Sequence, residues 1–311
     1  MASGLMMGSV SFTPEEFIKG LLGREDAINA NIIIYFHRLP RVLGAMIAGA
    51  GLSVSGVLLQ TVTSNDLASP NIIGVNSGAG LFCILLLAFF PLSYSLLPLV
   101  SFIGAFSATL MITAIGGKMG GSKTSFILAG IALTSLINGV ISFITLLDDE
   151  VLSSYNAFSI GGLKGVETER LIIPALIILI VFIISYLTAP KTELLLLGDD
   201  IAGSLGVRVS LMRISCLICA SASAAASVSF AGLLGFVGLV IPHIARKLSG
   251  TSVRNQLITS SVCGGILVVC ADTLGRTILA PTEIPVGIIM AFIGAPFLFF
   301  LIIKSKKYDD R

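Results

Sequence analysis

The sequence predicts an all-α polytopic membrane protein, and three observations carry this prediction. Of its 311 residues, 55% are hydrophobic and only 12% are charged, whereas about 25% of the residues in a soluble domain are charged. The mean hydropathy is +1.01. The apolar residues fall into blocks of about 20, which is the length that a helix needs to cross the hydrocarbon core of a bilayer. Together these features exclude a soluble domain.

Nine of these apolar blocks are expected to be membrane-spanning helices, separated by glycine, proline and charged residues. The seventh block is short and glycine-rich, and it ends at Pro242. The nine expected spans cover residues 42–63, 72–90, 94–115, 125–147, 171–189, 212–230, 232–248, 257–279 and 284–303.

The charges in the loops predict the orientation of the chain in the membrane. Lysine and arginine concentrate in cytoplasmic loops, and residues 304–307 (Lys-Ser-Lys-Lys) directly follow the ninth span. We therefore expect a cytoplasmic C-terminus. In this orientation most cations lie inside and most acids, such as Asp148 and Glu283, lie outside. Arg38 and Arg41 then fall at the extracytoplasmic mouth of the first span, an unusual position for cations that points to a function.

Three regions follow from this orientation: an extracytoplasmic N-terminal segment (1–41), a transmembrane domain (42–303) and a cytoplasmic tail (304–311). Within the first region, Thr13 and Pro14 are typical of the start of a helix. An odd number of spans with a cytoplasmic C-terminus puts the N-terminus outside. We therefore expect that one upstream helix is missing from this chain, and a natural nine-span protein is the alternative.

Two groups of four spans predict an inverted repeat. The first group begins outside at Arg41 and the second begins inside at Arg213, and such opposite starts are common among transporters. Small residues recur at helix-packing spacing in the pairs Ala45/Gly49, Gly51/Ser55 and Gly74/Gly78. They allow helices to approach closely in lipid.

Residues that would perform catalysis or couple transport to an ion gradient are scarce in the spans. Asp272 is the one candidate acid, and Arg276 lies one helical turn later, where it can pair with it. Ser77 and His243 are a weak basis for a membrane-embedded enzyme. The scarcity favours an energy source outside this chain, with a gradient-driven secondary transporter as the main alternative.

The cytoplasmic loop between the fifth and sixth spans, residues 194–207, has the pattern of a short helix. Gly198 can end the incoming span, and Asp199 or Asp200 can cap a helix from Ile201 to Leu205. Gly206 can then end it. A firm helix at the membrane surface suits a partner that pushes on the spans, although an ordinary interhelical loop fits the same pattern.

At this point the motifs resemble the FecCD family, which comprises permease subunits of ABC importers for iron–siderophores, haem and vitamin B12. The resemblance covers about residues 8 to 303. In the first half it rests on residues 38–41, 48–60, 65–70 and 74–79, and in the second half on Gly198-Asp199, Leu205-Gly206, Gly235–Arg246, Ala271-Asp272 with Arg276, Glu283–Gly287 and Gly294–Pro296.

The resemblance implies the type II importer permease fold, which has ten helices per subunit. It also implies three kinds of partner: a second permease subunit, identical or paralogous, two cytoplasmic ATPase subunits, and an extracytoplasmic substrate-binding protein. ATP and Mg²⁺ would be used by the ATPase, and no cofactor or metal is expected on this chain. The membrane would be the plasma membrane of a bacterium.

The resemblance further assigns roles to particular residues. Arg38, Arg41 and Arg276 would receive glutamates of the binding protein. The ATPase would act on a coupling helix, and the residues concerned are Gly198, Asp199, Asp200, Ile201, Ala202, Leu205 and Gly206. A cytoplasmic gate would lie at Gly121, Ser122, Lys123 and Thr124, and the path would be lined by residues of about 124–147 and 283–299.

Two departures from the family pattern stand out. The first family helix is missing, and the usual Asn-Pro-Leu reads Asn65-Asp66-Leu67, so we expect a less rigid turn there. The expected function is that of a permease subunit that moves a ferric siderophore. A haem or cobalamin permease of the same family is the alternative, and the gradient-driven transporter is the distant one.

Overall fold

The computed structural model describes residues 13–22, 28–71, 73–120 and 122–309. All regular secondary structure within these ranges is helical. The helices are α2 (Pro14–Leu21), α3 (Ile28–Ile32), η2 (Ile33–Arg38), α4 (Leu39–Thr63), α5 (Val75–Phe89), η3 (Pro91–Leu96), α6 (Leu97–Lys118), α7 (Lys123–Leu147), α8 (Asp149–Ile160), α9 (Thr168–Leu194), η4 (Leu195–Leu197), α10 (Asp199–Ser204), α11 (Val209–Ala231), α12 (Val237–Ser249), α13 (Val253–Thr277) and α14 (Val286–Asp309).

Six helical segments among the described residues are long and apolar enough to cross a membrane, and each matches one of the expected spans. They cover Ile28–Thr63, Pro91–Lys118, Thr124–Leu147, Thr168–Leu197, Val209–Ala231 and Val253–Thr277. Two shorter apolar helices, Val75–Phe89 and Val286–Leu301, match the second and ninth spans. The seventh corresponds to α12, which has only 13 residues. An all-helical membrane fold is confirmed, while the number of nine spans stays a prediction.

The first span begins earlier than the sequence indicated. Helix continues without a break from Ile28 to Thr63, 36 residues, whereas the expected span covered only residues 42–63. The segment before Pro40 is a π-helix, in which the Leu39 N–H reaches the Ile34 carbonyl. Proline has no N–H and disrupts the regular helical hydrogen bonding before it. The wider π turn accommodates this disruption, so that the helix continues past Pro40. Arg38 and Arg41 therefore lie inside a helix and not at its mouth.

The N-terminal helix α2 begins as the sequence predicted. Thr13 caps it, with the Glu16 N–H donating to the Thr13 hydroxyl, and the Glu16 carboxylate accepts the Thr13 N–H at 2.8 Å. These hydrogen bonds from Thr13 lower the pKa of the exposed Glu16 carboxyl.

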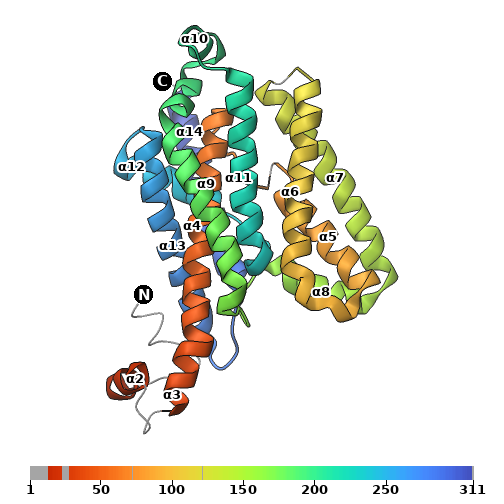
Figure 1. Cartoon of the computed structure of the whole chain (residues 1–311), viewed down its shortest axis with the longest axis vertical. Coiled ribbons are helices and arrows are strands. Elements are labelled where there is room, and N and C mark those ends of the chain that lie inside the picture. The colour runs from red at the N-terminus through yellow and green to blue at the C-terminus, as the bar shows by residue number, and fades with distance from the viewer. Residues whose placement is uncertain (1–12, 23–27, 72, 121, 310–311) are drawn as a thin grey trace.

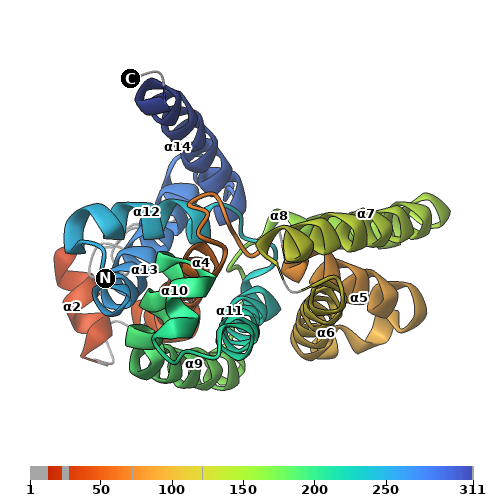
Figure 2. The same cartoon turned by 90° about the horizontal axis from the view of Figure 1, so that it is seen from above.

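Helix α4 occupies the middle of one helical group, where it packs against α9, α11, α12 and α13 (Figures 1 and 2). Helices α5, α6, α7 and α8 form a second group on the other side of α11. Seen from above, α7 and α14 extend outward from the two groups (Figure 2). The predicted span at 125–147 is the least buried of the six long apolar segments, with 22% of its window buried, and Thr168–Leu197 follows with 28%.

Small residues let α4 touch its neighbours backbone to backbone. A Cβ on Gly49 would overlap the carbonyl of Gly264 in α13, and one on Gly56 would overlap the carbonyl of Gly238 in α12. The same type of contact joins Gly78 in α5 to Gly104 in α6. Packing at Gly49 and Gly78, which the sequence predicted from spacing, is therefore confirmed.

Two elements differ from the expected boundaries. The acidic stretch that begins at Asp148 was expected to be a loop, but it caps and starts α8: the Asp148 carboxylate accepts the N–H groups of Glu150 and Val151. At the other end of the chain, α14 continues through residue 303 to Asp309, so most of the predicted tail is helical. The start of α8 follows from a capping signal that apolar block length does not measure.

We expect Gly56→Ala to lower the free energy of unfolding by about 1–3 kcal/mol, because a methyl group would push α4 away from α12. Thermal unfolding in detergent measures the change. Gly117→Ala is the matched control, since a Cβ on this α6 residue meets nothing within 4 Å. Its stability should be unchanged or slightly higher, and equal losses in both variants would contradict the packing explanation.

Candidate functional site

Four charged side chains form an ion network at the end of the bundle opposite α10. The Arg41 Nε, on α4, donates to both Asp272 carboxylate oxygens at 2.9 and 3.1 Å, and its Nη1 donates to Glu283 at 2.8 Å. The Arg276 Nε lies 3.0 Å from the Asp272 carboxylate, one turn along α13. Glu283 belongs to the connection between α13 and α14. The network thus joins α4 to α13 and to the start of α14.

This network is largely buried. The side chains of Asp272, Arg276 and Arg41 are 1%, 4% and 11% exposed, and Glu283 is half-buried. Buried charges are tolerated only when opposite charges and hydrogen bonds compensate them, and the two arginines and two acids here balance. The pairing of Asp272 with Arg276, predicted from their spacing, is confirmed.

The three arginines predicted to dock a binding protein lie together at this end but are not freely exposed. Arg38 is buried one turn before Arg41, and Arg41 and Arg276 hold Asp272. The sequence could not reveal the Arg41–Asp272 contact because the two residues are 231 positions apart. The docking role itself stays a prediction.

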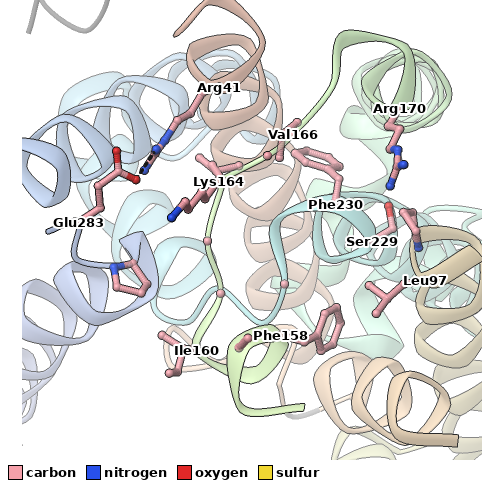
Figure 3. Close-up of a pocket in the computed structure, with 18 of the residues that line it drawn as sticks. Arg41, Leu97, Phe158, Ile160, Lys164, Val166, Arg170, Ser229, Phe230 and Glu283 are labelled. Atoms are coloured by element: carbon pink, nitrogen blue, oxygen red, sulfur yellow. Dashed lines mark hydrogen bonds and ion pairs between the residues drawn. The ribbon is translucent and has the colours of Figure 1, made fainter. Parts of the chain in front are cut away.

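A cavity of about 340 Å³ lies beside the network. Figure 3 shows Arg41 and Glu283 on one side of it and Arg170 on the other, with Lys164 extending between them. Lys164 is exposed, and the Arg170 Nε also donates to Glu167 at 2.9 Å. Both residues lie between the fourth and fifth expected spans, and sequence reasoning gave neither a role.

The connection between α8 and α9 forms part of the cavity wall and is held in place by backbone hydrogen bonds. The Gly162 N–H donates to the Ala231 carbonyl at 2.9 Å, and the Gly287 N–H donates to the Gly161 carbonyl at 3.2 Å. Gly161 has a φ of +77°, a conformation that glycine adopts without strain. The wall thus ties α8 to the end of α11 and the start of α14.

The short helix predicted near residues 201–205 is present at the opposite end as α10, and its role in coupling stays a prediction. It ends as expected, with Gly206 at a φ of +83°. Its start differs: Gly198 occupies the N-cap position, and no side chain caps the helix. The capping role predicted for Asp199 or Asp200 is therefore wrong. Asp199 instead accepts two hydrogen bonds from the Arg213 Nη2, at 2.7 and 2.9 Å.

The loop predicted to be a gate connects α6 to α7. Gly121 lies outside the described residues. Ser122 caps α7 by accepting the Ser125 N–H at 3.1 Å, and Thr124 is exposed in its first turn. Helix α7 itself begins at Lys123. The gate role is not tested by this arrangement and stays a prediction.

The turn that departs from the family pattern has its own hydrogen bonds. The Asn65 carboxamide oxygen accepts the Leu67 N–H at 2.9 Å, and the Asp66 carboxylate accepts from the Arg246 Nη1 of α12 at 2.5 Å. The aspartate therefore links this turn to a neighbouring helix, and the lower rigidity expected of the turn stays a prediction.

No cluster of three or more His, Cys, Asp or Glu side chains among the described residues could hold a metal ion. The charged side chains described here form ion pairs at both ends of an apolar bundle.

The comparisons with known proteins decide the family. A profile of the FecCD transport family matches residues 1–304. The chain belongs to the FecCD transport family. The membership predicted from the motifs is thus confirmed over nearly the whole chain.

Several curated relatives are similar over most of their length. The Fe(3+)-citrate import system permease protein YfmE of Bacillus subtilis is 35% identical over 98% of this chain and 90% of the relative. A probable heme-iron transport system permease protein, IsdF of Staphylococcus aureus, is 38% identical over 94% of this chain and 87% of the relative. Among solved structures, a metal-chelate type ABC transporter in an inward-facing conformation matches with a TM-score of 0.85 and 27% identity, over 97% of this chain and 96% of the other.

We expect Asp272→Ala to be strongly destabilising, because it leaves Arg41 and Arg276 without their shared acid in a buried site. Removing one partner of a buried ion pair costs about 3–5 kcal/mol. Glu167→Gln is the matched control, because it removes an acid from an exposed pair with Arg170, and exposed pairs contribute about 1 kcal/mol or less. Thermal unfolding of the two purified variants measures the difference, and similar midpoints would argue against the network.

Proposed function

We propose that this FecCD protein is the membrane permease subunit of an ATP-driven importer for a ferric siderophore. The observation that supports this most directly is similarity over nearly the whole chain to permeases for Fe(3+)-citrate, iron(3+)-hydroxamate and siderophores. Haem is the second candidate substrate, since IsdF is the relative with 38% identity. The chain acts as a transport subunit, and a separate subunit hydrolyses ATP.

The permease works as a pair with a second permease subunit, identical or paralogous. The outward-extending helices α7 and α14 expose large apolar side chains, among them Phe143 and Leu146 on α7 and Phe292 and Phe299 on α14. A second permease subunit can cover some of these side chains and lipid the others. The translocation path then runs between the two subunits, lined by residues of about 124–147 and 283–299.

Two cytoplasmic ATPase subunits bind Mg²⁺ and ATP and act on α10, the proposed coupling helix. Its exposed face includes Ile201 and Leu205, apolar side chains that an ATPase surface can receive. The movement opens or closes the cytoplasmic gate at residues 121–124. The orientation that fits this assignment has α10 and the C-terminus in the cytoplasm of a bacterium, with the N-terminal segment outside.

An extracytoplasmic binding protein delivers the chelate to the end that holds the ion network. Arg38, Arg41 and Arg276 are the proposed docking arginines there, although Asp272 and Glu283 balance the charges of Arg41 and Arg276 in the unbound permease. Lys164 and Arg170 add exposed positive charge around the cavity. Several weak ion pairs fix the register and the association rate of such a complex. In this proposal the subunit has the type II importer permease fold with an inverted repeat.

Uptake into proteoliposomes tests the proposed function. The permease is reconstituted with its ATPase and binding protein, and accumulation of ferric citrate, a ferric hydroxamate and haemin is followed with ATP inside the vesicles. We expect ATP to drive accumulation of one ferric chelate. Uptake that persists without ATP when an ion gradient is imposed would instead support a secondary transporter, and preferential uptake of haemin would select the second candidate.

Docking is tested by replacing Arg38 and Arg41 together with glutamine. We expect the binding protein to associate several-fold more slowly at low salt, and the difference to shrink at high salt, because screening weakens steering by charge. Arg38→Gln alone repeats the test without removing a partner of Asp272. Lys118→Gln, at the exposed end of α6 near the gate loop, is the control. Capture rates that do not respond to either arginine change would exclude this docking site.

A further inference from the structure

The N-terminal helix α2 lies across the direction of the long helices, at the end of the bundle that holds the ion network (Figures 1 and 2). It packs chiefly against α3. A Cβ on Gly20 would come within 2.8 Å of the Ala30 Cβ, and the Asn31 side-chain amide donates to the Gly20 carbonyl at 2.9 Å. This close contact and the hydrogen bond fix α2 to the first turns of the first spanning segment.

The side chains of α2 divide into a polar face and an apolar face. Glu15 and Lys19, one turn apart, form an ion pair at 2.9 Å on the first of these faces. Ile18 and Leu22, also one turn apart, are 55% and 65% exposed. By helical spacing Gly20, which contacts α3, lies between the two faces. Packing against α3 therefore leaves the apolar face of α2 exposed.

The helix to which α2 is fixed carries an apolar stripe of its own. Ile28, Ile32 and Phe36 are 58%, 45% and 72% exposed, and their spacing of four residues puts them on one side of the helix. The same side continues into the span with Leu39 and Leu43, which are partly exposed. The apolar surface next to α2 is thus continuous with a side of the span that can face lipid.

The length of this segment places α2 outside the hydrocarbon core. Helix runs without a break over 36 residues, Ile28–Thr63, which corresponds to about 50 Å at a rise of about 1.5 Å per residue. The hydrocarbon core is only about 30 Å thick, and the bilayer with its headgroups about 40–45 Å. Figure 1 shows α3 beyond the ends of the other long helices. The surplus length therefore lies at the α3 end, and α2 turns sideways at this level.

We propose that α2 is an interfacial helix that lies on the bilayer, with Ile18 and Leu22 inserted at the boundary between headgroups and acyl chains and with Glu15 and Lys19 in water. A helix in the membrane plane with separate apolar and charged faces has the form of such helices, which bury the apolar face by about 5–10 Å. Because α2 is fixed to α3, its insertion sets the depth at which the first span leaves the bilayer. This inference goes beyond the proposed transport function and requires only that the chain spans a membrane.

A partner protein or a second copy of this chain fits the apolar face less well. A specific protein interface buries about 800 Å² on each partner, far more than the apolar side of an eight-residue helix offers. Ile18 and Leu22 also carry no hydrogen-bonding group, whereas protein interfaces contain polar contacts throughout. Insertion into lipid needs neither a large area nor polar contacts, because each apolar side chain leaves water independently.

The sequence contains no tryptophan, so a single introduced tryptophan reports its own surroundings. Ile18→Trp and Leu22→Trp place the probe on the apolar face, and the full chain is reconstituted in phosphatidylcholine nanodiscs. Fluorescence is measured in three conditions: with bromine on the acyl chains close to the headgroups, with bromine near the chain ends, and with iodide in the water.

Two control variants calibrate the quenching. Glu15→Trp puts the probe on the polar face of the same helix, where the side chain is 78% exposed. Ile180→Trp puts it near the middle of α9, where the side chain is 55% exposed and reports the depth of the hydrocarbon core. Because all the replaced side chains are exposed, the thermal unfolding midpoint should stay unchanged in every variant.

We expect bromine close to the headgroups to lower the fluorescence of Ile18→Trp and Leu22→Trp about twofold, because the apolar face of an interfacial helix lies at that depth. Bromine near the chain ends should act most on Ile180→Trp, and iodide most on Glu15→Trp. Quenching of Ile18→Trp and Leu22→Trp by iodide alone would place the apolar face in water and overturn the proposal. Protection from both quenchers would place this face against protein and also overturn it. Equal quenching of Glu15→Trp by bromine would exclude the orientation proposed for the two faces.

Discussion

Close contact between the backbones of α4 and its neighbours is the constraint on which the rest of the structure depends. Gly49 and Gly56 bring α4 against α13 and α12, and at this separation polar groups of adjacent helices can reach each other. The Gln60 side-chain amide of α4 donates to the Leu239 carbonyl of α12 at 3.3 Å, and this bond satisfies a buried N–H where lipid offers no partner. A side chain larger than hydrogen at either glycine would separate the helices and leave such buried polar groups without hydrogen-bond partners.

The same close packing sets the geometry of the two charged ends. Arg41 can reach Asp272 only because α4 and α13 run side by side, and Arg213 can line a cavity with α7 only because α11 lies between the two helical groups. At one end the Arg41–Glu283 pair joins α4 to the connection before α14, and at the other the Asp199–Arg213 pair joins α10 to α11. These ion pairs lie at the two ends of the bundle, while the interior relies on close packing of small residues.

Much of the fold was predictable because bilayer thickness imposes a length on each apolar block. The six long helices and the start of α2 at Thr13 followed from such local signals, as did the i,i+4 pairing of Asp272 with Arg276. Predictions failed where a neighbour outside the segment decided the outcome. Asp199 is a good helix cap by composition, but Arg213, 14 residues away, engages its carboxylate. Helix also continued through Pro40, because a π-helical turn accommodated the proline.

By itself the sequence determined that this is an all-helical membrane protein of the FecCD transport family. The length of the apolar blocks, the charge of the loops and the short motifs are local properties, and each can be read directly from the amino-acid sequence. Only the tertiary structure decided what the charges do. It buried the arginines expected to be exposed, joined Arg41 to an acid 231 residues away, and placed Lys164 and Arg170 around a cavity. Those outcomes depend on which helices become neighbours, and the packing of the helices in three dimensions determines this.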